Sequence, residues 1–344
     1  LPQLDTLLIW NNFFSGPLPE NLGRHSKLKY VDVSTNEFVG EIPPGICAGG
    51  MLMKLILFSN NFTGGLHPSL SNCSTLVRLR VEDNSFSGEL SVIFSNLSEV
   101  IYMDLSRNKF VGGITVDITE ASSLQYLNVS NNPQLGGVIP EKLWSLPSLQ
   151  NFSAASCSIS GNIPSFDICK SMMVVDLSKN NLSGTVPESI SNCKGLLAMD
   201  LSINNLSGHI PVQLATLPAI SVLDMSHNSF SGPIPMQFGN SSSLKLLNVS
   251  FNDISGSIPL EKAFRMMDSS AFMGNPRLCG VPLRTCHGKG MPSGLELGSR
   301  RTQKFAWVLI SCAVIVLLIV MIIFGMLHFR KGTKGEWKIV SFSG

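Results

Sequence analysis

The stretch LLAMDLSINNLSGHIP, residues 196–211, contains the pattern that decides the fold. Asn204 stands at its centre, with apolar residues eight, five and three positions before it and an apolar residue, Gly and Ile-Pro after it. A period of about 24 residues predicts a repeat architecture, in which each unit stacks on the next. We call the recurring places the ladder positions; Cys157 fills one, and the others are Asn12, Asn36, Asn60, Asn84, Asn108, Asn132, Asn180, Asn204, Asn228 and Asn252.

Each repeat predicts one short strand. Residues 199–203, MDLSI, alternate apolar and polar side chains, which is the period of a strand with one buried face. Because such a strand cannot bury itself, stacked copies predict a parallel sheet on the inner face of an α/β-type solenoid of about eleven units. The ladder Asn can satisfy backbone groups of neighbouring loops, and the buried thiol of Cys157 can replace it as a weak donor. The Ser-Gly-x-Ile-Pro segment then returns on the outer side, since Pro disfavours helix there.

Composition narrows the class of protein. The 344 residues are 44% hydrophobic and 14% charged with a net charge of +2, which excludes a disordered polyelectrolyte and gives no support to nucleic-acid binding. No paired Cys-x-x-Cys motif or His/Cys cluster suggests a metal, and we expect no cofactor. Nine N-x-S/T sequons indicate a secreted, glycosylated domain, at Asn61, Asn72, Asn96, Asn128, Asn151, Asn181, Asn205, Asn240 and Asn248.

The chain divides into five predicted segments. Repeats occupy residues 1–260, a cap 261–286, an extracellular linker 287–304, a transmembrane helix 305–329 and the start of a cytoplasmic segment 330–344. The 25 residues of the fourth segment carry no formal charge and are long enough to cross a bilayer. The alternative, a buried core helix, lacks a remaining domain that could bury it. Because the chain begins inside a repeat, we interpret it as a fragment cut at both ends.

The cysteines fall into two predicted groups. Cys279 and Cys286 directly follow the last repeat, where a short disulfide would staple the cap over an exposed apolar end. Cys73, Cys169 and Cys193 each precede an apolar repeat position by three, so we interpret them, together with Cys47, as small buried residues that fill the core.

The complete pattern LxxLxLxxNxLSGxIPxxL, the cap LCGVPLRTC and the single span resemble those of plant leucine-rich-repeat receptor-like kinases. The resemblance extends from residue 1 to about residue 331 and is strongest to receptors of small secreted peptides, the class that includes the receptor of the tracheary-element differentiation inhibitory peptide. It implies a leucine-rich-repeat horseshoe at the plasma membrane, a peptide on the concave face and a co-receptor leucine-rich-repeat kinase. It also implies a Ser/Thr kinase or pseudokinase, although this chain itself contains no catalytic motif.

The concave face is read six, four and two residues before each ladder position. Membrane-distal units carry aromatic and charged residues there, which binding surfaces enrich. An alternative for the first of them, Trp10, is that it covers a preceding repeat. The candidate ligand-binding residues are Trp10, Tyr30, Lys54, Phe58, Arg78, Arg80, Glu82 and Tyr102.

The Arg78-Leu79-Arg80 segment is the sharpest signal on this face. Two guanidinium groups that project from one side of a strand can clamp a carboxylate with charge-assisted bonds, and the resemblance implies that this carboxylate is the free C-terminus of the peptide. Alternatively, Glu82 or Asp83 neutralises one Arg as an ordinary surface pair. Inner-face sequons first occur beyond this pair, so we expect the peptide to end there.

These expectations define a function with one principal alternative. The chain is predicted to be the ligand-binding ectodomain and membrane anchor of a plant receptor kinase. The alternative is a kinase-less receptor-like protein or decoy that binds ligand without phosphorylation. A secreted inhibitor of wall-degrading enzymes is disfavoured by the predicted membrane span.

Overall fold

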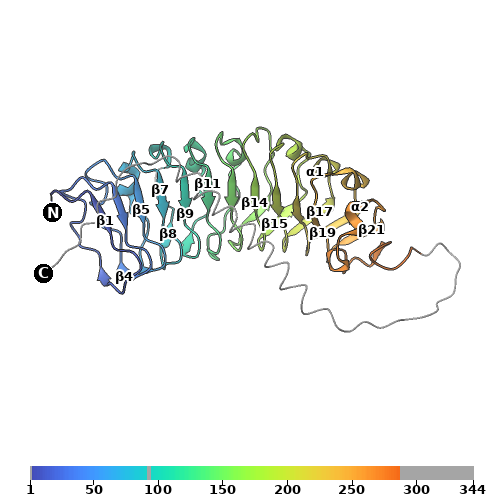
Figure 1. The fold of residues 1–344 in the computed structure, drawn as a ribbon, viewed down its shortest axis with the longest axis horizontal. Helices are drawn as coiled ribbons and strands as arrows, with labels where there is room; N and C mark the ends of the chain where they lie inside the picture. The colour runs from blue at the N-terminus through green and yellow to red at the C-terminus, as the bar shows by residue number, and fades with distance from the viewer. Residues whose placement is uncertain (1, 91–93, 287–344) are drawn as a thin grey trace. The chain divides into compact units, whose positions relative to one another are not determined.

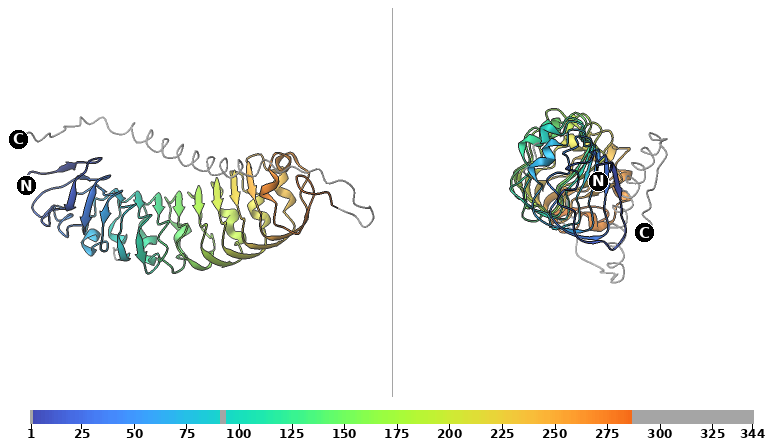
Figure 2. Two further views of the ribbon diagram at one scale, coloured as in Figure 1. Left: turned by 90° about the horizontal axis from the view of Figure 1, so that it is seen from below. Right: turned by 90° about the vertical axis from the view of Figure 1, so that its left-hand side faces the viewer.

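An eleven-stranded parallel sheet lines one side of the repeats, as the sequence predicts (Figure 1). The computed structural model describes residues 2–90 and 94–286. Within the repeats the strands follow an arc and lie on its inner side (Figure 2). In order, they are β1 (Thr6–Leu8), β3 (Tyr30–Asp32), β5 (Lys54–Ile56), β7 (Arg78–Arg80), β9 (Tyr102–Asp104), β11 (Tyr126–Asn128), β12 (Asn151–Ser153), β14 (Val174–Asp176), β16 (Ala198–Asp200), β18 (Val222–Asp224) and β20 (Leu246–Asn248).

The segments that follow the ladder positions form further parallel sheets. We expected no helix here, and the Ser-Gly stretches pair as short extended strands, whose glycines adopt positive φ, such as 75° at Gly184. The sheets are β2 (Ser15–Pro17), β4 (Glu37–Gly40) and β6 (Asn61–Phe62); β8 (Ser87–Glu89) and β10 (Lys109–Val111); and β13 (Ser160–Asn162), β15 (Asn181–Gly184), β17 (Asn205–His209), β19 (Ser229–Gly232), β21 (Asp253–Ser257) and β22 (Arg277–Cys279).

Short helical turns complete many of the described units. Most are single 3₁₀ turns, which fits the Pro that precedes several of them and the small number of residues left in each repeat. They are η1 (Pro68–Asn72), η2 (Phe94–Asn96), η3 (Val116–Glu120), η4 (Leu143–Ser145), η5 (Glu188–Asn192), α1 (Val212–Ala215), η6 (Met236–Asn240), α2 (Lys262–Arg265) and η7 (Ser269–Ala271).

The ladder asparagines join consecutive units. The amide nitrogen of Asn60 donates to the carbonyls of Val33 and Leu57 at 3.0 and 3.1 Å, and its oxygen accepts from the Phe38 N–H at 3.0 Å. Cys157 keeps one of these contacts, because its thiol lies 3.1 Å from the carbonyl oxygen of Val129. Inside the stack, ladder side chains such as Asn60 therefore satisfy buried backbone groups.

The ladder continues one step into the cap, which sequence reasoning missed. The Asn275 amide nitrogen donates to the carbonyls of Val249 and Phe272 at 2.9 and 3.0 Å, and its oxygen accepts from the Ile254 N–H at 3.0 Å. Its position, 23 residues after Asn252, was the available signal. The cap thus begins as an imperfect repeat before the Cys279–Cys286 disulfide, which is present as expected.

The other cysteines correct a prediction. Cys47 bonds to Cys73 and Cys169 bonds to Cys193, whereas we had interpreted all four as fillers of the core. They are buried as expected, but their sequence separations of 26 and 24 residues place each pair at comparable positions of adjacent units. Among the described residues Cys157 is the one free thiol.

The predicted linker 287–304, transmembrane helix 305–329 and cytoplasmic segment 330–344 lie outside the described residues. Within residues 2–90 and 94–286, no helix combines the length and apolar character needed to cross a membrane.

Candidate functional site

Most units carry a hydrogen-bonded polar pair on the inner face. Asp32 Oδ1 accepts from the backbone N–H and the hydroxyl of Ser34 at 3.1 and 2.6 Å. The bond from the Ser backbone N–H to the Asp or Asn oxygen recurs at residues 104 and 106, 128 and 130, 176 and 178, 200 and 202, 224 and 226, and 248 and 250. This repeated turn provides a regular background from which the first, third and fourth units depart.

In the units that depart from this turn, large side chains occupy the positions four and two residues before the ladder position. Leu8 and Trp10 stand there in the first unit, Ile56 and Phe58 in the third, and Arg80 with Glu82 in the fourth. Several of the candidate ligand-binding residues therefore lie where the chain departs from its own repeat. Trp10 is 53% exposed, and in the described structure no aromatic stacking or cation–π contact joins it to the other candidates.

A second row of side chains crosses five neighbouring strands in register. Lys54 pairs with Tyr30 on β3 and with Arg78 on β7, and the row continues through Tyr102 on β9 to Tyr126 on β11. The Lys54 ammonium lies 5.5 Å from the centre of the Tyr30 ring, and the Arg78 guanidinium lies 4.8 Å from that of Tyr102. The two tyrosine rings of β9 and β11 stack at 4.2 Å. Tyr126 was missed from the sequence, although it stands six residues before ladder position Asn132, like its partner in the preceding unit.

The two arginines project from the same face of β7, since Leu79 between them is only 1% exposed. The Arg80 guanidinium lies 4.0 Å from the centre of the Phe58 ring, and its Nε donates to Glu82 Oε1 at 2.8 Å. Glu82 is 2% exposed, and its Oε2 has no hydrogen-bond partner among the described residues. The ion pair is therefore largely buried and differs from the exposed surface pair considered as an alternative. Each guanidinium rests on an aromatic ring that limits its motion.

The electrostatics of this site follow from burial beside several charges. Burial lowers the pKa of Arg78, whereas Glu82 raises the pKa of Arg80 above its ordinary value despite burial. The pKa of Lys54 is lowered by burial and by the nearby Arg78. Burial and the Asp104 carboxylate raise the pKa of Tyr102 to about 12, so its phenol stays neutral and can donate a hydrogen bond.

Chemically, this arrangement suits an anion next to apolar or aromatic groups. The guanidinium groups present N–H donors, the aromatic rings present flat apolar area, and the tyrosine hydroxyls add polar contacts at the edge. We call Tyr30, Lys54, Phe58, Arg78, Arg80, Tyr102 and Tyr126 the arginine–aromatic surface.

The sequons lie in two environments. Six asparagines are exposed and lie off the inner sheet, at Asn61, Asn72, Asn96, Asn181, Asn205 and Asn240. Asn128, Asn151 and Asn248 are half-buried and end or begin strands of the inner sheet, on β11, β12 and β20. Asn128 thus shares β11 with Tyr126, and Asn151 is aligned with Tyr126 on the next strand.

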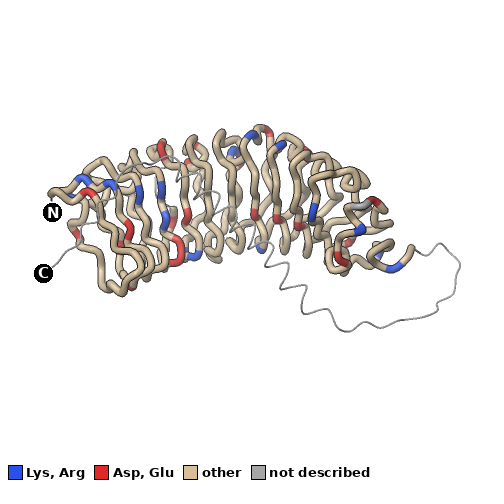
Figure 3. Tube along the Cα trace, in the orientation of Figure 1, with Lys and Arg blue, Asp and Glu red and all other residues tan. Residues whose placement is uncertain are grey.

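Between Asn151 and Asn248 the inner face is regular and acidic. Asp176, Asp200 and Asp224 are aligned in register on β14, β16 and β18. Acidic positions recur there on successive strands, whereas basic and acidic residues are mixed along the N-terminal strands (Figure 3). This difference in charge separates two halves of one sheet.

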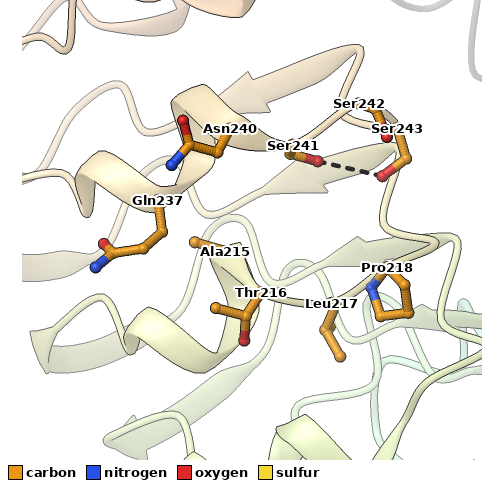
Figure 4. Close-up of a pocket in the computed structure, with 9 residues that line it drawn as sticks. All are labelled: Ala215, Thr216, Leu217, Pro218, Gln237, Asn240, Ser241, Ser242 and Ser243. Carbon is orange, nitrogen blue, oxygen red and sulfur yellow. Dashed lines mark hydrogen bonds between the residues drawn. The ribbon is translucent and has the colours of Figure 1, made fainter.

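An open hollow of about 300 Å³ lies away from the arginine–aromatic surface (Figure 4). No charged side chain lines it, and a glycan on Asn240 would stand at its wall. Its lining includes Ser and Thr hydroxyls but no His, Asp, Glu, Cys or Lys that could act on them as a general base. Its lining residues are Ala215, Thr216, Leu217, Pro218, Gln237, Asn240, Ser241, Ser242 and Ser243.

The comparisons with known proteins agree with this architecture. Leucine-rich-repeat family models match residues 123–146, 170–230 and 240–258. A search of curated proteins finds no match. The chain is a leucine-rich-repeat protein, and its repeats resemble the ectodomains of plant leucine-rich-repeat receptor kinases.

Three solved structures illustrate the similarity. A TDR receptor is 42% identical with a TM-score of 0.79, and the match covers 83% of this chain and 49% of that chain. The Arabidopsis receptor kinase HAESA, in complex with the peptide hormone IDA and the co-receptor SERK1, is 37% identical with a TM-score of 0.75, covering 82% and 47%. The plant peptide hormone receptor RGFR1, in complex with RGF2, is 28% identical with a TM-score of 0.71, covering 80% and 48%. The chain thus spans about half the length of the solved structures it matches.

Proposed function

We propose that this chain is the ligand-binding ectodomain and membrane anchor of a plasma-membrane receptor kinase that recognises a small secreted peptide. The observation that carries the proposal is the pair of guanidinium groups of Arg78 and Arg80 on β7, each held over an aromatic ring. Two adjacent planar donors of this kind match the geometry of a carboxylate. The C-terminus of the peptide supplies that carboxylate.

The other residues of the arginine–aromatic surface determine the direction in which the peptide lies. Tyr30, Lys54 and Phe58 contact residues that precede its C-terminus, and Trp10 extends this contact to the first unit. Glycans on Asn128 and Asn151 limit the peptide on the other side of the arginine pair. Exposed aromatic rings bind a peptide with little loss of side-chain entropy, which explains their number here.

Signalling follows from association with a second receptor. The bound peptide completes a surface for a co-receptor leucine-rich-repeat kinase, as in the HAESA complex that contains both IDA and SERK1. Residues 305–329 anchor the chain in the membrane and connect it to a kinase or pseudokinase. A kinase-less receptor-like protein or decoy would share the binding step and lack phosphorylation.

Peptide titration tests the proposal. The full chain in detergent is titrated with the tracheary-element differentiation inhibitory peptide and with IDA, each as the free acid. At least one should bind, and the Arg78→Ala/Arg80→Ala variant should lose about a hundredfold in affinity, since it removes two charge-assisted contacts. Arg107→Ala is the matched control, because Arg107 is exposed and pairs with Asp83 at 3.8 Å. Equal affinity of the double variant and the parent chain would overturn the proposal.

A further inference from the structure

Two of the guanidinium nitrogens of Arg80 already donate hydrogen bonds within the chain. Its Nε donates to Glu82 Oε1 at 2.8 Å, and its Nη2 donates to the same oxygen. The Nε–Nη2 edge of a guanidinium presents two parallel N–H groups that suit a bidentate carboxylate. Glu82 therefore occupies, within the chain, an edge that a ligand carboxylate could use.

We propose that Glu82 is a proton-operated latch, which holds this edge of Arg80 when it is ionised and releases it to a ligand carboxylate when it is protonated. The inference rests on the proposed function, because the released donors serve the C-terminus of the peptide. It adds a regulatory role for protons at the same site.

Three features of Glu82 support the latch. First, the side chain is 2% exposed, so water cannot stabilise its charge. Second, Oε2 is buried without a hydrogen-bond partner among the described residues, so the carboxylate is incompletely satisfied. Third, the place it occupies holds Ser in most other units, where a hydroxyl satisfies the preceding Asp or Asn. A carboxylate is thus exceptional at this place.

The surrounding charges oppose one another. Burial and the Asp104 carboxylate on β9 raise the pKa of Glu82 above 4.5, while Arg80 acts in the opposite direction. On the other side, the segment that follows β5 presents the uncharged Phe58 ring to Arg80. The titratable and charged groups around the latch are Arg78, Arg80, Asp83, Tyr102 and Asp104, with Lys54 acting on Arg78.

The direction of the effect follows from linkage. An anion placed beside Glu82 disfavours its ionised form, so ligand binding takes up a proton. Affinity must then rise as the pH falls toward 4.5, the ordinary pKa of this carboxyl group. Because one charge-assisted contact is gained, we expect peptide affinity to be about tenfold higher at about pH 5 than at about pH 7.5.

The test compares Glu82→Gln with the parent chain, using the free-acid peptides named above. The amide keeps the shape and removes the charge, so this variant should bind at about pH 7.5 as tightly as the parent chain binds at about pH 5, with less than about twofold pH dependence. Asp83→Asn is the matched control, because Asp83 is the adjacent, exposed carboxylate; it should retain the dependence of the parent chain. A tenfold pH dependence that survives in Glu82→Gln would overturn the latch.

A measurement without ligand separates this inference from the proposed function. Infrared difference spectra between about pH 5 and about pH 7.5 are recorded in an Asp200→Asn background, because the Asp200 carboxyl group, with a pKa of about 7, also titrates in this window. They should show a protonated carboxylic acid band that is lost at the higher pH and is missing when Glu82→Gln is added. If this band is present and neither peptide binds, the latch stands and the proposed function fails. If the variant leaves the band unchanged, the latch fails whatever the peptides do.

Discussion

Substitution of Asp200 should change how the stability of the repeats depends on pH. Asp200 stands between Asp176 and Asp224 on adjacent strands, and burial, followed by these two carboxylates, raises its pKa from 3.8 to about 7. The neighbours also receive neutral donors, from Ser153 at 3.4 Å and from Asn248 at 2.9 Å respectively. The middle carboxyl therefore bears most of the repulsion in this row.

The magnitude follows from that rise in pKa. It corresponds to about 4 kcal/mol at about 1.36 kcal/mol per pKa unit, as an upper limit. Because the folded pKa is raised, the stability associated with this group is fully present below 3.8 and is lost as the pH rises through about 7. Asp200→Asn removes the titration and keeps an oxygen to accept from Ser202. The variant should be more stable than the parent chain by about 2–4 kcal/mol at about pH 8.

Urea unfolding, followed by circular dichroism at about pH 4 and about pH 8, measures this difference. Asp32→Asn is the matched control. Asp32 likewise accepts a hydrogen bond from the Ser two residues after it, but its neighbours in register are the uncharged Leu8 and Ile56. The control should not gain stability at the higher pH. If Asp200→Asn is no more stable than the parent chain at about pH 8, or keeps its pH dependence, the reasoning about the acidic row is refuted.

Two further predictions concern the repeat itself. Asn180→Ala should destabilise the chain by about 3–5 kcal/mol in urea unfolding, because Asn180 serves three carbonyls and two N–H groups; Asn12→Ala, which removes two exposed bonds, should cost less than about 1 kcal/mol. Comparable losses in both variants would contradict the ladder. Replacing Cys169 and Cys193 by Ala should lower stability by about 3 kcal/mol, since their bond closes a loop with a sequence separation of 24 residues; no change would show that the disulfide is dispensable.

The 24-residue period of the sequence predicts most of the fold. It locates all eleven inner strands, because the alternation around each ladder position states which side chains must be buried. The Cys169–Cys193 bond was missed because local sequence shows burial but not the approach of two adjacent turns, which comes to 4.8 Å between Cα atoms. A separation of one full repeat was the overlooked signal. Asn275 was missed because the residues after it, Pro276 and Arg277, depart from the apolar residue and Ser-Gly that follow most ladder positions.

The binding surface was predictable in part. Spacing alone puts Arg78 and Arg80 on one face of a strand, and the structure has them there. It does not reveal that Glu82 is buried, because the same place holds small hydroxyl residues in other units and a longer side chain could have turned to solvent. The tyrosine stack of Tyr102 and Tyr126 likewise depends on register between strands, which only the assembled sheet specifies.

The most direct test asks whether the arginine pair reads the C-terminus of a peptide. Affinities are measured for the free-acid and C-terminally amidated forms of one bound peptide, against the parent chain and against Arg78→Ala/Arg80→Ala. Amidation should weaken binding to the parent chain by at least about tenfold and to the variant by less than about twofold, because the variant lacks the groups that sense the charge. Equal affinity of the parent chain for acid and amide, or the same loss in both proteins, would contradict the carboxylate clamp.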